Sequence, residues 1–348
     1  MQELLEVSRD GVETKRPPAG KQGMLKLQGA ARETPDFAAR SPSAVVCVAT
    51  FRRPDMLRQT LDSLVAQTRV GDIAVIVVDN DANGRAGAAV ADEVFSSGAL
   101  SGLCVVEATP GHCSASNRAL FEARTRFPSA SYILMIDDDE IADPLWVERM
   151  IAAVRKNNVD VVGGPVLPEF PGEAVATHRR HPIYWPAYDK SGPVRMIYGS
   201  GNFLIRRDAL ARLDNPQFDL RYNFLGGGDT DFFTRCQKAG LTSYWENDAR
   251  IFETVTPDRL ETAWIVRRSL RIGAINYRLD RDKRQGALGT AWLAAKNAAL
   301  LPVSAMRSLK LALRGEPLLV WAHPTMVAVG RLFAWAGIEP EQYRFKAP

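Results

Sequence analysis

Short apolar runs alternate with helix-like segments through the first half of the chain. Each run is bounded by turn residues and is too short for a helix, which predicts buried strands over 45–49, 73–78, 103–107 and 132–136. Between them, Leu57, Leu61, Leu64 and Val65 recur at helical spacing, and 114–126 and 144–156 have the same character. This alternation predicts an α/β fold, a mostly parallel sheet flanked by helices.

Polar side chains follow three of the predicted strands. Thr50 ends the first strand, Asp79 ends the second, and the triad Asp137 to Asp139 ends the fourth. Ligands of such sheets sit outside the carboxyl ends of the strands, so we expect these groups to meet at one site. Adjacent carboxylates repel one another unless a cation lies among them, and Mg²⁺ and Mn²⁺ prefer oxygen ligands. Because Asp143-Pro144 already supplies a start for the next helix, the triad is available for a metal; a solvated acidic loop is the alternative.

No glycine-rich phosphate loop follows the first strand. The chain has neither Gly-x-Gly-x-x-Gly there nor Gly-x-x-x-x-Gly-Lys-Ser/Thr. The sequence therefore does not support dinucleotide or P-loop chemistry, and we expect a metal ion to hold any bound phosphates.

The middle of the chain is less regular. Prolines break up 165–193 into a loop-rich insert, where His178 and His181 lack the paired helical spacing of metal ligands. A glycine-bearing strand is predicted over 197–205, in which the glycines allow a ligand to approach or form a bulge. A glycine run then precedes Asp229 at the start of a helix that ends at Gly240, and Asp229 is either a helix cap or a functional acid.

Composition divides the 348 residues into three parts. Residues 1–42 are polar, with prolines and glycines, and are predicted to be a disordered tail without a signal sequence; 43–258 form the α/β part, and 259–348 a basic helical region. The hydrophobic content of 46% is typical of a globular protein. Four widely spaced cysteines with no Cys-x-x-Cys pair favour a reducing compartment over a disulfide framework.

The C-terminal region is predicted to be helical and cationic. Glu261 to Asp280 has helical character, and between Arg259 and Arg331 there are thirteen Lys or Arg against four Asp or Glu, a local charge of about +9. Charges interrupt the apolar stretches of 285–338, so an interfacial amphipathic anchor with Trp292, Trp321 and Trp335 at headgroup level fits better than a transmembrane helix. A packing subdomain or a dimer surface is the alternative.

Seven motifs together resemble the family 2 inverting glycosyltransferases of GT-A fold, most closely the bacterial exopolysaccharide or succinoglycan type. The resemblance covers roughly Val45 to Arg278. It rests on the order and spacing of Val48–Pro54, Val78–Asn80, Gly111–Asn117, Asp137–Asp139, Gly201–Phe203, Gly227–Asp231 and Glu253–Arg259.

The resemblance implies a role for each matching residue. Asp229 would be the catalytic base, and Asp137 and Asp139 would hold Mn²⁺ or Mg²⁺ against the donor diphosphate. The donor would be bound by Thr50, Phe51, Arg53, Asp79, Asn117, Arg118, Asp137 and Asp138. The acceptor side would be formed by Gly201, Asn202, Gly227, Gly228 and Asp231.

Two positions depart from the family pattern. The family often has Arg just before the asparagine of the third motif, whereas here Arg118 follows Asn117. It usually has Glu before the catalytic Asp, and here that position is Gly228. The first departure concerns the diphosphate contact and the second the acceptor side.

The resemblance implies an inverting transferase that moves a sugar from a nucleotide-diphosphate sugar, UDP by family habit, to a glycan or a lipid-linked saccharide. We expect it in the cytoplasm at the inner face of the cell membrane, with no nucleic acid as partner. A catalytically silent sugar-nucleotide-binding scaffold is a second hypothesis, supported by Gly228 and the shifted Arg118. A metal-dependent nucleotidyltransferase is a third, but it would normally need a glycine- and lysine-rich loop near the first strand.

Overall fold

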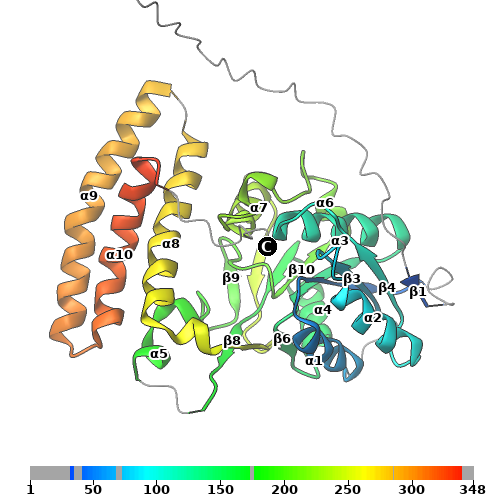
Figure 1. Ribbon diagram of the computed structural model, residues 1–348. Helices are drawn as coiled ribbons and strands as arrows, with labels where there is room; N and C mark the ends of the chain where they lie inside the picture. Colours follow the sequence, from blue (N-terminus) through cyan, green and yellow to red (C-terminus); the bar gives the residue numbers. More distant parts are fainter. Residues whose placement is uncertain (1–31, 35–40, 68–72, 173–175, 285, 339–348) are drawn as a thin grey trace, which may run out of the picture.

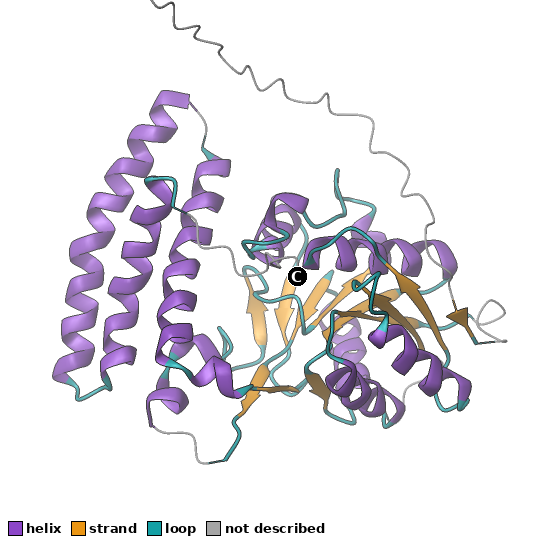
Figure 2. Ribbon diagram, in the orientation of Figure 1, coloured by secondary structure: helices purple, strands orange, loops and turns teal. Residues whose placement is uncertain are grey.

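The fold is an α/β unit with three long helices beside it, described here by a computed structural model (Figure 1). The structure describes residues 32–34, 41–67, 73–172, 176–284 and 286–338. Strands gather in the α/β unit, and the part that follows it is entirely helical (Figure 2). The predicted α/β class with a helical C-terminal extension is confirmed.

The central sheet has nine strands in the order β1-β4-β3-β2-β5-β10-β7-β11-β9. Its first-half strands β4, β3, β2 and β5 are mutually parallel, as the alternating pattern predicted. The strand β10 then runs antiparallel to both β5 and β7. The strands are β1 (Arg32–Glu33), β2 (Ala44–Thr50), β3 (Ile73–Asp79), β4 (Gly102–Val106), β5 (Tyr132–Asp137), β7 (Val161–Gly163), β9 (Gly192–Val194), β10 (Phe203–Arg206) and β11 (Ser243–Trp245).

A second sheet of three short strands lies beyond the end of β5. Its order is β6 (Glu140–Ala142), β12 (Ile251–Thr254) and β8 (Val166–Glu169). β12 pairs with β6, which directly follows the acidic triad. This pairing brings Glu253, more than a hundred residues away in sequence, opposite Glu140.

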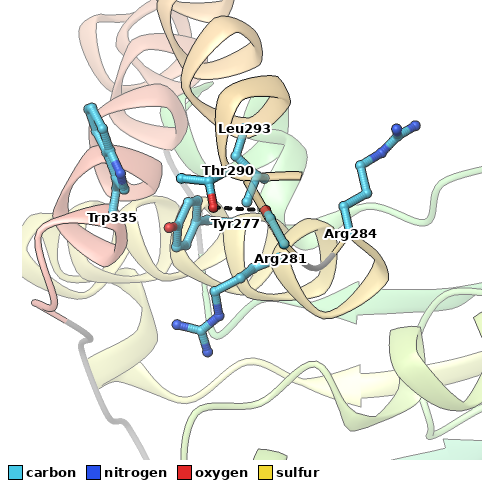
Figure 3. Close-up of a pocket in the computed structure, with 7 residues that line it drawn as sticks. Tyr277, Arg281, Arg284, Thr290, Leu293 and Trp335 are labelled. Atoms are coloured by element: carbon cyan, nitrogen blue, oxygen red, sulfur yellow. Dashed lines mark hydrogen bonds between the residues drawn. The ribbon is translucent and has the colours of Figure 1, made fainter. Parts of the chain in front are cut away.

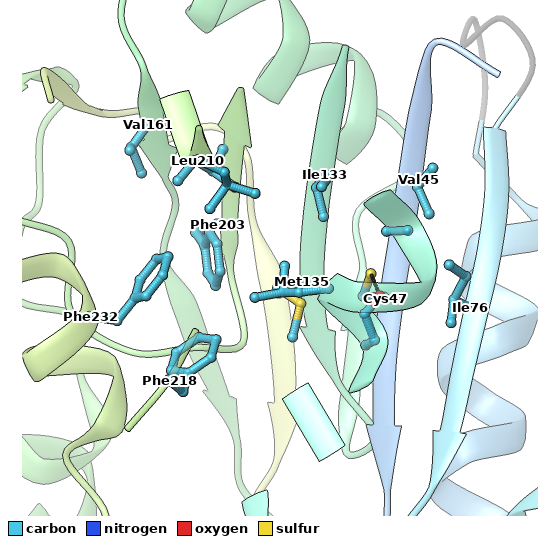
Figure 4. Packing of buried hydrophobic residues seen from close by; sticks show 14 of the residues in the cluster. Val45, Cys47, Ile76, Ile133, Met135, Val161, Phe203, Leu210, Phe218 and Phe232 are labelled. Carbon is cyan, nitrogen blue, oxygen red and sulfur yellow. Dashed lines mark hydrogen bonds between the residues drawn. The ribbon is translucent and has the colours of Figure 1, made fainter. Parts of the chain in front are cut away.

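Helices cover both faces of the central sheet because successive strand residues point to opposite faces. Val46 and Val48 pack with α1 (Pro54–Val65), α2 (Ala86–Ser96) and α4 (Trp146–Asn157). Val45 and Cys47 pack on the other face with α3 (His112–Arg126) and α7 (Gly228–Lys238), and α6 (Arg207–Leu210) lies on that face too. Figure 4 shows this second layer, in which Phe203 and Met135 lie between the strands and Phe232 of α7.

Several element boundaries differ from the sequence predictions. The helix predicted from residue 144 begins at Trp146, because a turn precedes it. In this turn the Asp143 side chain accepts a hydrogen bond from the Leu145 N–H at 3.0 Å. The strand predicted over 197–205 is confined to Phe203–Arg206. β1 lies within the predicted tail 1–42 and pairs with β4, so that part of the tail is an edge strand; residues 1–31 and 35–40 lie outside the described residues.

The helical unit consists of α8 (Thr262–Lys283), α9 (Gly286–Leu313) and α10 (Leu318–Trp335). α10 lies between α8 and α9 (Figure 1). The α8–α10 contact is a close backbone approach: a Cβ at Gly273 would overlap the Val327 carbonyl oxygen, and a Cβ at Gly330 would overlap that of Leu270. By length and composition, α10 is the single helix within the described ranges that could cross a bilayer.

Short helices complete the chain. They are α5 (Ala176–Arg180), η2 (Pro182–Tyr184), η3 (Leu220–Tyr222) and η4 (Pro257–Leu260). The boundary predicted at 258/259 falls inside η4, and Arg259 at this point reaches back to the α/β unit.

Candidate active site

Three residues at the end of β2 and just after it converge on the carboxylate of Asp138. The Thr50 hydroxyl donates to Oδ2 at 2.8 Å, the Phe51 N–H donates to the same oxygen at 3.3 Å, and Arg53 donates to Oδ1 at 3.1 Å. Asp138 is buried, and burial raises its pKa, while the Arg53 guanidinium opposes that rise. The end of β2 is thus fixed to the loop after β5, as expected for polar groups at neighbouring strand ends.

Asp139 is held by two arginines from distant parts of the chain. Its Oδ2 accepts from Arg53 and from Arg259, each at 2.8 Å, and the side chain is 5% exposed. Arg259 also pairs with Glu253 at 2.5 Å. Because two charged donors share one carboxylate oxygen in a buried setting, Asp139 is anchored between the start of α1 and η4.

Asp137 and Glu140 lie together without an arginine. The Asp137 N–H donates to Glu140 Oε2 at 2.8 Å, and no ion pair of either carboxylate occurs in the described part of the chain. Burial raises the pKa of Asp137 to about 6, and the charges of Asp139 and Asp138 add to the rise, while His112 lowers it. Burial and the neighbouring Asp137 raise the pKa of Glu140 well above its usual range.

These five carboxylates, Asp137, Asp138, Asp139, Glu140 and Glu253, form what we term the acidic cluster. Only Arg53 and Arg259 pair with it among the described residues, which leaves an excess of negative charge. A hard divalent cation fits such an oxygen donor set, in which Asp137 and Glu140 are the carboxylates not already engaged by arginine. No group of three His, Cys, Asp or Glu side chains in the described ranges is already arranged to hold a metal.

Asp229 lies in the first turn of α7 but does not cap it. Gly227, in a left-handed conformation with φ of 91°, is the N-cap residue, and the cap has no side-chain hydrogen bond. Asp229 Oδ2 instead accepts from the N–H of Gly199 at 2.8 Å. Gly199 lies in the loop that precedes β10 in the chain. Asp231 pairs with Arg235 one turn further along the same helix. The carboxylate of Asp229 is therefore oriented by the Gly199 loop, and the helix-cap alternative does not describe it.

The turn Gly199 to Gly201 joins Asp229 to the acidic cluster. Next to Gly199, the Ser200 hydroxyl lies 3.0 Å from His112 Nε2, and the charge of His112 acts on Asp137. The following Gly201 packs so closely on Glu140 that a Cβ would overlap its carboxylate. Three successive residues thus contact the predicted base, a histidine and the acidic cluster, which places all three around one site.

Asp79 and Asn202 are occupied inside the protein. Asp79 has no exposed surface, and its two oxygens accept from the N–H groups of Asp81 and Ala88 at 2.9 and 2.8 Å. The Asn202 amide bonds Trp146, Pro165 and Ala249, each at 2.9 Å. These side chains hold the strand ends in place, and the contacts with substrate expected of them stay predictions.

Asn117 and Arg118 are likewise engaged within the fold. Asn117 exchanges two hydrogen bonds with the backbone of Phe218, at 2.8 and 2.7 Å. Arg118 is 3% exposed and donates to Glu122 at 2.8 Å, with Glu107 also near. The arginine that departs from the family pattern therefore forms an ion pair in the interior, and its donor contact remains a prediction.

The second departure, Gly228, has a packing explanation. A Cβ at this position would lie 2.6 Å from the sulfur of Cys113 in α3. The thiol therefore occupies the space that any side chain at 228 would enter. Gly227, the other glycine of the pair, packs against Ile275 of α8, which brings the helical unit against the residues before Asp229.

The insert histidines contribute to packing rather than to the acidic cluster. His181 is fully buried, with its ring centroid 4.9 Å from that of His323 in α10, and His323 Nδ1 lies 2.9 Å from the Ser269 hydroxyl. Burial lowers the pKa of each of these two histidines to about 4, so both are neutral at pH 7. They join the insert to the helical unit.

Several site residues, among them Glu253, received no role from the sequence. Glu140 directly follows the triad, and the excess of carboxylates there was the available signal. His112 and Ser200 approach each other only in the tertiary structure. Arg259 lies in one of the seven motifs, but nothing local indicates that it reaches Asp139.

Comparisons with known proteins show to which family the chain is similar. The family "Glycosyl transferase family 2" matches residues 45–214, and "Glycosyl transferase family group 2" matches 132–337. The succinoglycan biosynthesis protein ExoM of Rhizobium meliloti is 32% identical over 249 residues, which cover 70% of this chain and 77% of that protein. A glucosyl-dolichyl phosphate glucuronosyltransferase of Haloferax volcanii is 26% identical over 248 residues, 65% of this chain and 73% of its own.

The fold has a solved counterpart. The mannosyltransferase PcManGT from Pyrobaculum calidifontis, solved in complex with GDP-Man and Mn²⁺, superposes with a TM-score of 0.56 at 18% identity, covering 89% of this chain and 91% of that one. This likeness and the sheet topology confirm the predicted GT-A fold. The chain is a transferase and belongs to glycosyltransferase family 2, of the exopolysaccharide type.

Proposed function

We propose that the protein is a metal-dependent inverting glycosyltransferase that moves a sugar from a nucleotide-diphosphate sugar to a saccharide hydroxyl. The observation that carries this proposal is the turn Gly199 to Gly201, which contacts both Asp229 and the acidic cluster. A base and a diphosphate-binding site must flank one anomeric carbon in a single-displacement transfer. The turn supplies a short physical link between those two groups.

Asp229 is the proposed general base. Its Oδ2 is held by the Gly199 N–H, while no ion pair of Asp229 occurs in the described ranges, so the carboxylate can accept a proton from an acceptor hydroxyl. Attack from the side of Asp229, opposite the leaving diphosphate, inverts the anomeric centre.

The acidic cluster is the proposed cation site, with Asp137 and, by the family resemblance, Asp139 as ligands. A bound Mn²⁺ or Mg²⁺ would supply positive charge for the leaving diphosphate. Asp139 already accepts from Arg53 and Arg259. These arginines therefore stand where they can also contact phosphate oxygens, with Arg53 at the start of α1.

The partners of the reaction follow from the family and its relatives. We propose a UDP-linked donor and a glycan or lipid-linked saccharide acceptor in surface or exopolysaccharide synthesis. The related ExoM is named as a succinoglycan biosynthesis protein, and the Haloferax relative as acting on glucosyl-dolichyl phosphate. A peripheral position at the inner face of the cell membrane suits such an acceptor.

The test is a panel of sugar nucleotides, with diphosphate release measured in the presence of Mn²⁺, Mg²⁺ or EDTA. One donor should be turned over only with a divalent cation, and NMR of the first product should show the anomeric configuration inverted. Asp229→Asn should lower turnover by about 10²–10⁴-fold while its affinity for the donor stays within about twofold of wild type. Asp248→Asn, an exposed carboxylate remote from the cluster, is the control and should retain full activity.

A silent scaffold predicts a different result. One donor would bind with micromolar affinity, yet no diphosphate would be released with any cation, even with membrane extract as the acceptor source. Release of pyrophosphate instead of nucleoside diphosphate would identify a nucleotidyltransferase. Either outcome would overturn the proposed transfer reaction.

A further inference from the structure

α9 is the outermost element of the molecule (Figure 1). Its main partner is α10, which lies between it and α8, so one long side of α9 faces away from the protein. At 28 residues the helix is about 42 Å long at 1.5 Å per residue. A helix of this length that is covered on one side only presents a large continuous surface.

The outward side of α9 is apolar along its whole length. Leu288 is 88% exposed, Leu313 is 80% exposed, and Met306 and Leu309 are 63% and 60% exposed. Alanines fill the exposed positions between them, at 287, 291, 295, 298, 299 and 305. Most exposed large hydrophobic residues in the described ranges lie on α9, on α10 or just after α10. Patches of this kind mark interaction surfaces.

The charges on this side are all positive. Residues 286–313 contain no Asp or Glu, and Arg307, Lys310 and the adjacent Arg314 are exposed cations with no ion pair in the described part of the chain. The remaining cation of α9, Lys296, pairs with Asp280 and lies over Trp292, on the side facing α8. An apolar face bordered by unpaired cations complements a surface that is both apolar and anionic.

One end of the helical unit adds arginines and aromatic rings. A cavity of about 400 Å³ opens there between α8, the start of α9 and the end of α10. Figure 3 shows Tyr277 and Thr290 in its centre, with Arg281, Arg284 and Trp335 around it. Trp335 is 54% exposed, and Arg284 is stacked on Trp292 at 3.9 Å. Arginine and tryptophan are the residues typical of a headgroup layer.

We propose that the outer face of α9 lies flat on an anionic lipid bilayer, with its cations and the arginine-lined end toward the lipid headgroups. This inference names the surface through which the protein would take the peripheral membrane position given under the proposed function. It rests on that proposed function only for the location in the cell. A second copy of the chain fits the face less well. A parallel pairing of two α9 faces would bring cation against cation, and residues 286–313 contain no acidic residue to pair with these cations in any arrangement of two α9 faces.

The same structure argues for surface contact rather than a span. α10 has the length and composition of a span, but Gly330 fixes its backbone against α8, and Arg331 is buried and paired with Asp280 at 2.8 Å. α9 exceeds the bilayer core of about 30 Å and carries cations in its second half. Both helices therefore stay in the three-helix unit, and α9 offers one face to the membrane.

Vesicle flotation tests this inference with the full chain. Wild type should float with phosphatidylcholine vesicles that contain phosphatidylglycerol, and less as NaCl is raised. Leu309→Glu/Leu313→Glu should weaken this binding by at least about 30-fold, because two apolar side chains that would contact the bilayer become carboxylates, which the anionic lipids repel. Arg307→Gln and Lys310→Gln should each weaken it by about fivefold on anionic vesicles only.

The control is Val65→Glu, the same kind of apolar-to-acidic change at an exposed residue of α1, 40% exposed, which should float like wild type. Circular dichroism should show all variants folded, since the changed side chains are exposed. Wild type that fails to float on anionic vesicles would overturn the inference. So would a wild-type dimer that Leu309→Glu/Leu313→Glu converts to monomer without any vesicle binding, since a second copy would then cover the face.

Failure of this inference is separable from failure of the proposed reaction. Metal-dependent donor hydrolysis in detergent-free solution should be unchanged in Leu309→Glu/Leu313→Glu, because the main contacts of α9 are with α10 and α8 and both leucines are exposed. Lost vesicle binding with intact hydrolysis supports both proposals. Intact hydrolysis in a wild type that binds no vesicles contradicts only the membrane surface.

Discussion

The acidic cluster and the outer face of α9 invert the usual distribution of residues in opposite ways. At the strand ends, charged groups are inside: Asp138, Asp139 and Glu140 are each at most 5% exposed. On α9, large apolar side chains are outside, with Leu288 and Leu313 at least 80% exposed. Each arrangement costs free energy unless something compensates it. Within the cluster the compensation is partly present as arginines, whereas on α9 no described part of the chain supplies it.

The comparison therefore separates two kinds of incomplete surface. The acidic cluster keeps an excess of negative charge that a small cation would balance. The α9 face keeps an excess of apolar area that the described part of the chain leaves exposed.

The sharpest test of the cluster is to compare Asp137 with its neighbour Asp138. Asp137→Asn should weaken Mn²⁺ binding by more than about 100-fold, beyond the 10–100-fold cost of losing a group that only orients a ligand. Electron paramagnetic resonance of free Mn²⁺ measures this without any substrate. Asp138→Asn should bind Mn²⁺ within tenfold of wild type, because its oxygens are engaged by Thr50, Phe51 and Arg53. Equal losses in the two variants would contradict this assignment.

One added methyl group at the α8–α10 contact should destabilise the helical unit. Gly330→Ala places a Cβ against the Leu270 carbonyl oxygen, where backbone must move, and should lower the free energy of unfolding by about 3 kcal/mol. Urea denaturation followed by tryptophan fluorescence measures it. Gly192→Ala is the control, since no atom lies within 4 Å of its added Cβ, and it should change stability by less than about 0.5 kcal/mol.

The packing of Gly228 on Cys113 can be tested by a double-mutant cycle. Gly228→Ala should destabilise the protein by about 2 kcal/mol, because its Cβ would lie 2.6 Å from the Cys113 sulfur. Adding Cys113→Ala removes the sulfur, so the double variant should be more stable than the sum of the single changes predicts, by at least about 1 kcal/mol. Additive losses would show that the thiol is not the reason for a glycine before Asp229.

The smallest effect concerns pH. His181 and His323 have pKa values lowered to about 4 by burial, so the unfolded chain binds more protons than the folded one between about pH 6.5 and 4. Their contribution is fully present above pH 6.5 and is lost as the pH falls toward 4. As the pH falls from 7 to 5, each histidine should lower the free energy of unfolding by on the order of 1 kcal/mol, and His323→Gln should reduce that loss. A pH profile unchanged by His323→Gln would contradict this role.

Local pattern was sufficient for most of the fold. The strands β2, β3, β4 and β5 were predicted within a residue or two, because each is a continuous apolar run between turn residues. Errors occurred where tertiary contacts overrode the pattern. Residues 197–202 have strand-like alternation, yet this segment is a loop whose N–H and hydroxyl groups bond Asp229 and His112 instead of a neighbouring strand.

The α/β order, the carboxylates at the strand ends, Asp229 at a helix start and the cationic, apolar C-terminal helices could all be predicted from local sequence, because each depends on residues near one another in the chain. How these groups are used depends on the tertiary structure. It joined Arg259 to Asp139, seated Gly201 on Glu140, turned Arg118 and Asn202 inward, and left one side of α9 uncovered. The physical reason is that pairing and burial depend on long-range packing, which brings together side chains a hundred residues apart and decides which faces remain open.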